Sequence, residues 1–453
     1  TGTETVSVMQ YISDLTGAIV VTMASEVAQA TARRAATLCQ DANVPIAGVI
    51  ENMSGFECPS CGVNTAVLRT GGGAALVAWL NVRGETAIAA AAAPSTGTPQ
   101  QIERGEYLAR AGNCMTCHTT RGGLPYAGGR GIATPFGTVY AGNLTPDAET
   151  GLGSWSAEHF WRALHHGRSF DGRLLYPAFP YPDTTRVTRE DSDALYAYLR
   201  SLPAVKQANT PHALQFPYGT QAALAVWRAL FFRPGSFEPE ASQSAEWNRG
   251  AYLVRGLGHC AACHGGRNFL GATPQGGLSL AGGLIPMRNW YAPALSAPDQ
   301  AGVADWPLDD IVALLRTGVS PRGSALGPMA DVVYRSLQHL RIDDLRAIAT
   351  FLKALPPTRS QSGDGKPADP AVLELGAKRY EKHCADCHGA RGEGVKSPAG
   401  AWMYPPLAGN RTVTMDPPAN LVRVIVHGGF LPATAGNPRP FGMPPFGLVL
   451  DDD

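Results

Sequence analysis

The sequence predicts a mainly α protein in which three repeated helical domains follow an incomplete α/β segment. An internal repeat organises the chain after about residue 100. A strand–helix–strand pattern precedes residue 85, which is typical of a parallel α/β unit. Gly and Pro together make up about a fifth of the chain, against a usual share of about an eighth. We therefore expect short elements joined by long ordered loops.

Composition excludes some classes of partner. The 453 residues include 37 Lys+Arg and 37 Asp+Glu, so the formal net charge is zero. No charge excess favours binding to nucleic acid or to an anionic membrane surface. The hydrophobic share of 44% permits real cores and excludes wholesale disorder.

The α/β segment is expected over residues 1–85. Two β-branched runs, Gly17–Met23 (GAIVVTM) and Val44–Ile50 (VPIAGVI), flank a helical pattern at Glu26–Asp41. Residues 86–100, rich in small side chains, are expected to form a linker to the repeats.

Each repeat opens with a helical pattern that leads into a cysteine pair. The three copies are RGEYLARAGNCMTCH (104–118), RGAYLVRGLGHCAACH (249–264) and the looser LGAKRYEKHCADCH (375–388). Tyr and apolar residues lie at helical spacing before the cysteines, so each pair is expected at the end of a short helix.

The first two repeats also close alike. Asp191–Pro203 and Ile342–Pro356 are amphipathic, with acidic residues in the first turn and a proline stop. The third reaches only Asp451–Asp453, where such a helix would begin, so we expect that domain to be truncated before its last helix. The expected domains are residues 101–205, 246–357 and 371–453.

Two connecting segments complete this division. Residues 358–370 are a polar, Gly/Pro-rich linker. Residues 206–245 hold the apolar run AALAVWRALFF, which Arg228 interrupts and which is too short to span a membrane. It is either a packed connecting helix or a surface that docks on a partner or a lipid.

Three cysteine pairs carry the attachment signal for c-type haem, Cys-x-x-Cys-His. Thiols one helical turn apart can form thioethers to the two vinyl groups of one porphyrin, and the adjacent histidine can then ligate the iron. A zinc site would need four N/S ligands and a second cluster within reach. We therefore predict three haems with these thioether and proximal ligands: Cys114, Cys117 and His118; Cys260, Cys263 and His264; Cys384, Cys387 and His388.

A low-spin electron-transfer haem needs a sixth ligand, and a methionine thioether raises its potential. Met329 lies in the second repeat within GPM, and Met443 lies in the third within FGMPPF. Their Pro/Gly surroundings and matching placement predict axial ligation, the alternative being core packing.

The first repeat departs from this pattern. Phe179 stands in YPAFPYP where the methionine would fall, and no Met occurs between His118 and Pro203. The first haem is then five-coordinate or ligated by His165 or His166, for which a surface or helix-capping role is the alternative.

From about Gln101 to Asp453 the chain resembles the three-haem cytochrome c subunit of bacterial membrane-bound dehydrogenases, whose partners include quinoprotein alcohol dehydrogenase and flavin-dependent gluconate and sorbitol dehydrogenases. The resemblance rests on the two longer repeat segments and on GRLLYPAFPYP, LGPMADVV and GNPRPFGMPPF. It implies three tandem cytochrome c-like domains at the periplasmic face of the inner membrane, with peripheral membrane association. It also implies electron transfer from a dehydrogenase catalytic subunit to ubiquinone or a terminal oxidase. Related cytochromes with a molybdenum-dependent partner also carry Phe where this sequence has Phe179. The resemblance therefore implies a partner of the quinoprotein, flavoprotein or molybdenum type.

Residues 1–85 resemble the C-terminal part of Mrp/ApbC-type P-loop ATPases that carry iron–sulfur clusters. The matching runs are GAIVVTMASEVA, VPIAGVIENMSGFECPSCG and RTGGGAALVAWL. In that family a Cys-Pro-x-Cys pair bridges a cluster, which maps to Cys58 and Cys61 as ligands of an iron–sulfur cluster or zinc. The alternative is an idle or disulfide-linked pair. No phosphate-binding loop of the GxxxxGK[ST] type occurs in the chain, so ATP hydrolysis is not predicted.

Three functions follow. The leading one is an electron-transfer subunit rather than a stand-alone catalyst. The second is an iron–sulfur carrier or scaffold acting through Cys58 and Cys61, and the third is a peroxidase-like enzyme at an open first haem. No signal peptide opens the sequence, although c-type haem is attached outside the cytoplasm. A fusion or assembly product with a functional cytochrome half is one interpretation of this conflict.

Overall fold

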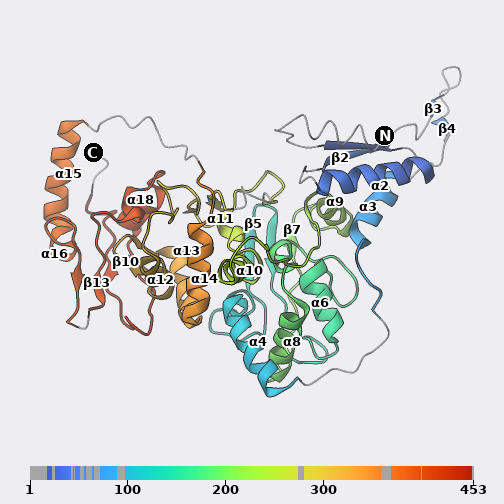
Figure 1. Cartoon of the computed structure of the whole chain (residues 1–453), viewed down its shortest axis with the longest axis horizontal. Coiled ribbons are helices and arrows are strands. Elements are labelled where there is room, and N and C mark those ends of the chain that lie inside the picture. The colour runs from blue at the N-terminus through green and yellow to red at the C-terminus, as the bar shows by residue number, and fades with distance from the viewer. Residues whose placement is uncertain are drawn as a thin grey trace.

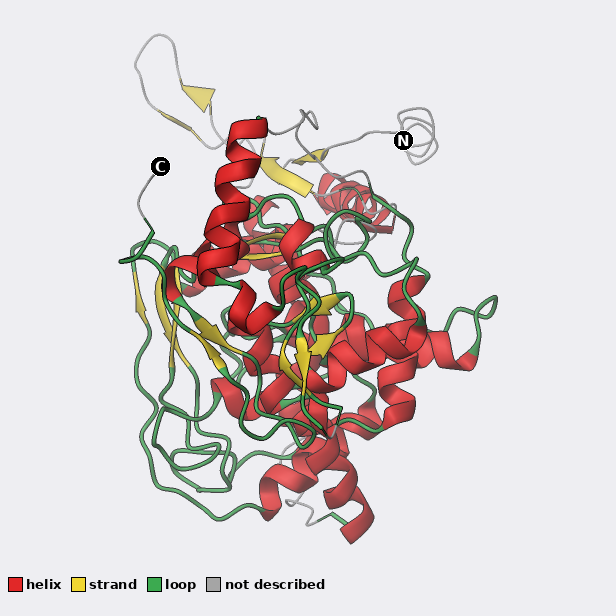
Figure 2. Cartoon of the chain, turned by 90° about the vertical axis from the view of Figure 1, so that its left-hand side faces the viewer, coloured by secondary structure: helices red, strands yellow, loops and turns green. Residues whose placement is uncertain are grey.

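The computed structural model describes residues 18–22, 26–41, 44, 46–51, 56–57, 64–65, 72–88, 97–273, 280–358, 369–398 and 400–450. These residues form many short helices and small two- or three-stranded sheets joined by long loops (Figures 1 and 2). The Gly and Pro content thus has its expected effect. Within the described ranges, no helix is both long and apolar enough to cross a bilayer.

The N-terminal segment is a fragment of a parallel α/β unit. Strands β1 (Ala18–Thr22) and β2 (Ile46–Glu51) pair in parallel, and α2 (Glu26–Asp41) connects them, as the sequence predicts. A hairpin, β3 (Phe56–Glu57) and β4 (Asn64–Thr65), and helix α3 (Gly72–Val82) follow. Val20, Ala36 and Ile46 form a small core with residues of α3.

The first repeat begins at helix α4 (Pro99–Ala111). Thr98 caps it through a capping box with Gln101, and Pro99 occupies its first turn. Helix α4 therefore starts just inside the expected linker 86–100. The other elements of this repeat are α5 (Cys114–Cys117), β5 (Gly131–Thr134), β6 (Gly137–Tyr140), α6 (Ala157–His166), α7 (Tyr181–Thr184), α8 (Arg189–Ser201) and β7 (Ala213–Leu214).

The second repeat follows the connecting helix α9 (Gln221–Phe231). It opens with α10 (Ala245–Tyr252) and a π-helical turn at Leu253–Leu257, which is kinked at Gly256, where φ of −109° and ψ of −105° are not helical. The remaining elements are α11 (Ala261–His264), β8 (Gly283–Ile285), β9 (Trp290–Ala292), α12 (Leu308–Thr317), β10 (Val319–Ser320), β11 (Gly323–Ser324), α13 (Gly327–Arg335), a 3₁₀ turn (Leu337–His339) and α14 (Ile342–Lys353).

The third repeat packs beside the second. Asn410 donates a hydrogen bond to Ser324 Oγ at 3.0 Å, and the Asn420 amide bonds both the N–H and the carbonyl of Tyr291. Its elements are α15 (Pro370–His383), α16 (Ala385–His388), β12 (Val395–Lys396), β13 (Trp402–Tyr404), α17 (Arg411–Thr414), α18 (Ala419–His427), β14 (Gly429–Phe430) and β15 (Gly442–Met443). Asp451–Asp453 lie outside the described residues.

In the first two repeats the opening and closing helices cross in close contact. A Cβ added to Gly105 of α4 would collide with the carbonyl oxygen of Ala194 on α8. Gly250 of α10 faces Ala347 of α14 in the same way. Glycine is required at both positions because the backbones approach so closely.

The two helix pairs are joined by a reciprocal set of hydrogen bonds. Within the first repeat Arg104 binds Asp191, and within the second Arg249 binds Asp344 through two parallel bonds of 2.7 and 2.8 Å. The tyrosine three residues after each of these arginines bonds the aspartate of the other repeat. Tyr107 donates to Asp344 at 2.5 Å, and Tyr252 donates to Asp191 at 2.6 Å. This pattern has approximate two-fold symmetry.

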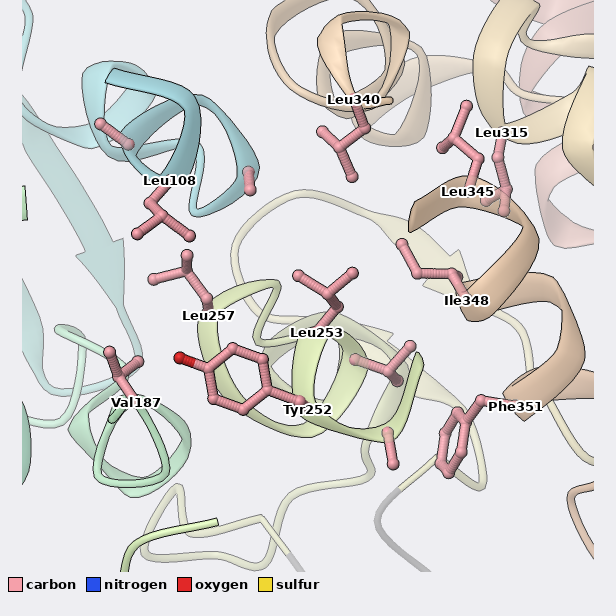
Figure 3. Close-up of a cluster of buried hydrophobic side chains, with 14 of the residues drawn as sticks. Leu108, Val187, Tyr252, Leu253, Leu257, Leu315, Leu340, Leu345, Ile348 and Phe351 are labelled. Carbon is pink, nitrogen blue, oxygen red and sulfur yellow. The ribbon is translucent and has the colours of Figure 1, made fainter. Parts of the chain in front are cut away.

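One hydrophobic core runs through both repeats. Leu108 of α4, Leu253 and Leu257 of the π-helical turn, and Leu345 and Phe351 of α14 are buried in the same cluster (Figure 3). The first and second repeats are therefore parts of one folded body.

Helix α9 connects this body to the N-terminal segment. It packs against α3, so the packed-helix interpretation of the apolar run is correct. Arg228 of α9 is buried and donates hydrogen bonds to Asn81 Oδ1 at 3.0 Å and to the carbonyl of His166. Nearby, Arg168 forms an ion pair with Glu85 at 2.7 Å. Polar groups thus hold the N-terminal segment against the first repeat.

Candidate haem-binding site

Each Cys-x-x-Cys-His motif forms one helical turn. The backbone N–H of His118 donates to the carbonyl of Cys114 at 3.1 Å, and His264 and His388 repeat this bond to Cys260 and Cys384, each at 2.9 Å. One such turn brings both thiols and the imidazole to one region, as attachment to a single porphyrin requires.

The three motif histidines share a second interaction that the motif does not reveal. Nδ1 of His118 lies 2.7 Å from the carbonyl oxygen of Gly142. In His264 and His388 the same atom lies 2.8 and 2.9 Å from the carbonyls of Pro293 and Pro405. A carbonyl can only accept, so Nδ1 carries the proton and Nε2 keeps a free lone pair. Each imidazole is therefore prepared to bind a metal through Nε2.

The electrostatics of the first two motifs favour neutral ligands. Burial lowers the pKa of His118 and of His264, and this effect outweighs the opposing hydrogen bonds to the carbonyls. Burial also raises the pKa of Cys114 and of Cys260 to about 12. These are apolar surroundings that suit a porphyrin edge.

The two methionines predicted as axial ligands lie in a helix and in a strand. Met329 is in the first turn of α13, after Pro328, and packs partly buried against the shared core. Met443 is in β15, where it pairs with Gly429 of β14. In the first repeat, Phe179 packs against the shared core.

Of the two roles expected as alternatives for His165 and His166, on the surface or at a helix end, the surface role is wrong. Both are buried in the last turn of α6 because the apolar face of that helix turns inward. His165 stacks on Trp161 at a centroid distance of 4.4 Å. Burial, together with the neighbouring His165 and Arg228, lowers the pKa of His166 to about 4.

Cys58 and Cys61 lie outside the described residues. In the described part of the chain, His, Cys, Asp and Glu side chains do not gather in groups of three or more that could hold a metal ion. Cys39, the unpaired cysteine of the sequence, is buried in the N-terminal core.

The comparisons with known proteins agree with this geometry. Residues 102–203 match the family model for cytochrome c, and residues 371–453 match that for subunit III of cbb3-type cytochrome c oxidase. The cytochrome c subunit of quinone-dependent alcohol dehydrogenase from Komagataeibacter europaeus is 39% identical over 365 residues, which cover 77% of each chain. The chain belongs to the family of dehydrogenase cytochrome c subunits.

A further relative of this cytochrome c subunit is one of the subunits of nicotinate dehydrogenase from Pseudomonas putida. It is 43% identical over 356 residues, which cover 78% of this chain and 29% of that protein. The donor set of each motif fits a covalently attached haem: two thiols, and an imidazole whose Nε2 is free. A haem held there would supply one-electron redox chemistry, while the motif cysteines and histidine would anchor it and orient its iron.

The N-terminal part of the cytochrome c subunit is similar to a different family. Residues 1–102 match the family model for the NUBPL iron-transfer P-loop NTPase. An iron–sulfur cluster carrier protein of Methanocaldococcus jannaschii is 42% identical over 73 residues, which cover 16% of this chain and 25% of that protein. The cytochrome is therefore preceded by a segment that is similar to part of an iron–sulfur carrier.

Sequence reasoning missed the three carbonyl acceptors. Gly142 and Pro293 each follow a Tyr-Ala pair, and Pro405 directly follows a tyrosine. A tyrosine shortly after each motif was the available signal. It is weak, because the acceptor itself is a backbone atom.

Proposed function

We propose that this cytochrome c subunit transfers electrons through three c-type haems, held in domains over residues 101–205, 246–357 and 371–453. The observation that carries the proposal is the repeated bond from each motif histidine to a backbone carbonyl. It leaves three Nε2 atoms free, each beside a pair of cysteines.

The axial ligands distinguish the three sites. Met329 and Met443 are the proposed sixth ligands of the second and third haems, and both lie close to Pro and Gly in the sequence. The first repeat offers Phe179 instead, so its haem binds small ligands such as carbon monoxide when reduced.

The proposed electron donor is the catalytic subunit of a dehydrogenase, of the quinoprotein, flavoprotein or molybdenum type. The relatives named above are subunits of alcohol and nicotinate dehydrogenases, which supports this assignment. The proposed acceptor is ubiquinone or a terminal oxidase, with the cytochrome part at the periplasmic face of the inner membrane.

A haem count combined with a redox titration tests the central proposal. The pyridine haemochrome assay on the purified chain is expected to give three haems per polypeptide, and the titration three one-electron steps. Carbon monoxide is expected to bind one of the three reduced haems. Fewer than three haems would refute the proposal.

An iron–sulfur function is a second candidate, favoured by the match of residues 1–102 to an iron-transfer NTPase. It would use Cys58 and Cys61. Iron and labile sulfide remaining after subtraction of haem iron, and lost in the Cys58→Ser/Cys61→Ser variant, would support it. Peroxide turnover at the first haem is the third alternative, and six-coordinate spectra at all three haems would eliminate it.

A further inference from the structure

We propose that His259 is a positioning residue that holds the first two haem-attachment loops at a fixed separation for electron exchange. This inference rests on the proposed function, because it concerns the two haems assigned to Cys114 and Cys260.

The two loops touch at the residues just before their cysteines. Nε2 of His259, which precedes Cys260, lies 3.2 Å from the carbonyl oxygen of Gly112. Gly112 is only two residues before Cys114. Because the carbonyl can only accept, the imidazole donates Nε2–H, and one hydrogen bond joins the two attachment loops.

Close packing around Gly112 accompanies this hydrogen bond. A Cβ added to Gly112 would lie 3.1 Å from Cδ1 of Leu257 and 3.3 Å from Sγ of Cys114. Leu257 extends from the second repeat toward Leu108 of the first (Figure 3). An alanine at position 112 would therefore press against Leu257, whose side chain would have to shift by a few tenths of an ångström.

His259 has a left-handed backbone conformation. Its φ is +38°, in the left-handed region that most side chains avoid. Asn113, the residue before Cys114, has φ +51°, but it accepts a local hydrogen bond from Thr116 at 2.5 Å. Among the described residues of the two loops, only the side chain that precedes the first cysteine of the second repeat bonds the other loop.

The third repeat supplies a matched control. His383 stands directly before Cys384, as His259 stands before Cys260. Its ring contacts Phe446 at a centroid distance of 5.9 Å, and its buried Nε2 has no hydrogen-bond partner in the described part of the chain. Histidine at this motif position therefore does not by itself connect two loops.

Two substitutions disturb the contact in different ways. His259→Asn tolerates the left-handed backbone but is too short to reach Gly112. Gly112→Ala keeps His259 and inserts a wedge against Leu257, at a residue whose φ of −79° suits any side chain. His259→Gln restores a donor of similar reach, and His383→Asn is the control.

Circular dichroism in the Soret band and flash reduction provide the readouts. The exciton couplet depends on the separation and orientation of the two haems, and the flash experiment follows electron redistribution between them. We expect His259→Asn and Gly112→Ala to reduce the couplet and to slow redistribution several-fold. We expect His259→Gln to recover most of both signals and His383→Asn to match the wild type.

The outcomes separate this inference from the proposed function. Fewer than three haems in the wild-type chain would refute the proposed function itself. Three haems in both variants, with an unchanged couplet and rate, would overturn the role of His259. If His259→Asn loses haem, Gly112→Ala decides the question, since it retains the imidazole.

Discussion

Each motif histidine is oriented by a backbone carbonyl and not by a side chain. Substituting Gly142, Pro293 or Pro405 changes a side chain but keeps the backbone carbonyl that orients the proposed proximal ligand. The proposed sixth ligands, Met329 and Met443, depend instead on single side chains.

Replacing a proposed axial methionine tests this difference. Met329→Leu and Met443→Leu keep the approximate volume of the side chain but remove the thioether. Each variant is expected to gain one carbon monoxide-binding haem in the reduced state and to lose potential at that haem. Carbon monoxide difference spectra measure the first effect. Met403→Leu, at a partly buried methionine of β13 that is not a proposed ligand, is the control. An unchanged spectrum for Met329→Leu would remove Met329 from the ligand set.

Asp344 is expected to make the folded chain less stable as the pH falls into the acid range. Burial raises its pKa, but hydrogen bonds from Arg249 and Tyr107 outweigh this effect and hold it below the ordinary value of 3.8. A lowered pKa stabilises the folded state above the unfolded value, and the contribution disappears as the pH falls through the folded value. Asp344→Asn is expected to cost about 2 kcal/mol or more at neutral pH.

Denaturant unfolding of both proteins across pH measures this effect. The difference in unfolding free energy is expected to stay constant above about pH 4, near the unfolded reference value, and to shrink below it. A difference that persists unchanged at lower pH would contradict the assignment.

The motif residues could be predicted from sequence, whereas their orientation could not. Two thiols and a histidine at fixed spacing define an attachment site chemically. The acceptor for Nδ1 is a carbonyl 24 residues away in the first repeat and 29 in the second. No side-chain pattern records such a partner. The burial of His165 and His166 was missed because it depends on how α6 packs against the rest of the repeat.

At the scale of elements, the helix crossings depend on single glycines. Gly105→Ala and Gly250→Ala place a methyl group against the backbone of the closing helix and are expected to cost about 1 to 3 kcal/mol or more. Gly376 holds the corresponding position in α15, where an added Cβ meets no atom of the described structure within 4 Å.

Gly376→Ala is therefore the matched control. Alanine favours a helix interior over glycine by about 0.5 to 1 kcal/mol, so this variant is expected to be neutral or slightly stabilising. Thermal unfolding measures all three variants. Equal, small gains in stability at all three positions would mean that the glycines act only through helix propensity.

The repeat pattern predicted these helices well, because amphipathic spacing and caps are local signals. The crossed Tyr107–Asp344 and Tyr252–Asp191 pairs were not predicted, because each joins residues from different repeats. The sequence shows that the repeats are similar, but their mutual packing depends on contacts distant along the chain.

For the whole molecule, Arg228 links the N-terminal segment to the cytochrome. Asn81 accepts from its guanidinium, and Asn81 also donates to the carbonyl of Ala225 at 2.8 Å. Arg228→Ala and Asn81→Ala are each expected to destabilise the chain, and the double variant to lose less than their sum. The expected coupling is about 0.5 to 3 kcal/mol.

Denaturant unfolding of the double-mutant cycle measures this coupling, and limited proteolysis shows whether residues 1–85 become accessible. Arg233→Ala, at an exposed ion pair with Asp41, is the control and is expected to change stability little. Strictly additive losses would mean that the contact does not hold the two parts together.

The π-helical turn at Leu253–Leu257 makes the two attachment loops unequal. The path from Gly250 to Cys260 is one residue longer than that from Gly105 to Cys114, and a π-helical turn accommodates such an extra residue. The extra residue breaks the approximate two-fold symmetry of the two repeats beside the second cysteine pair. Two duplicated sequences therefore surround their attachment motifs with different backbones.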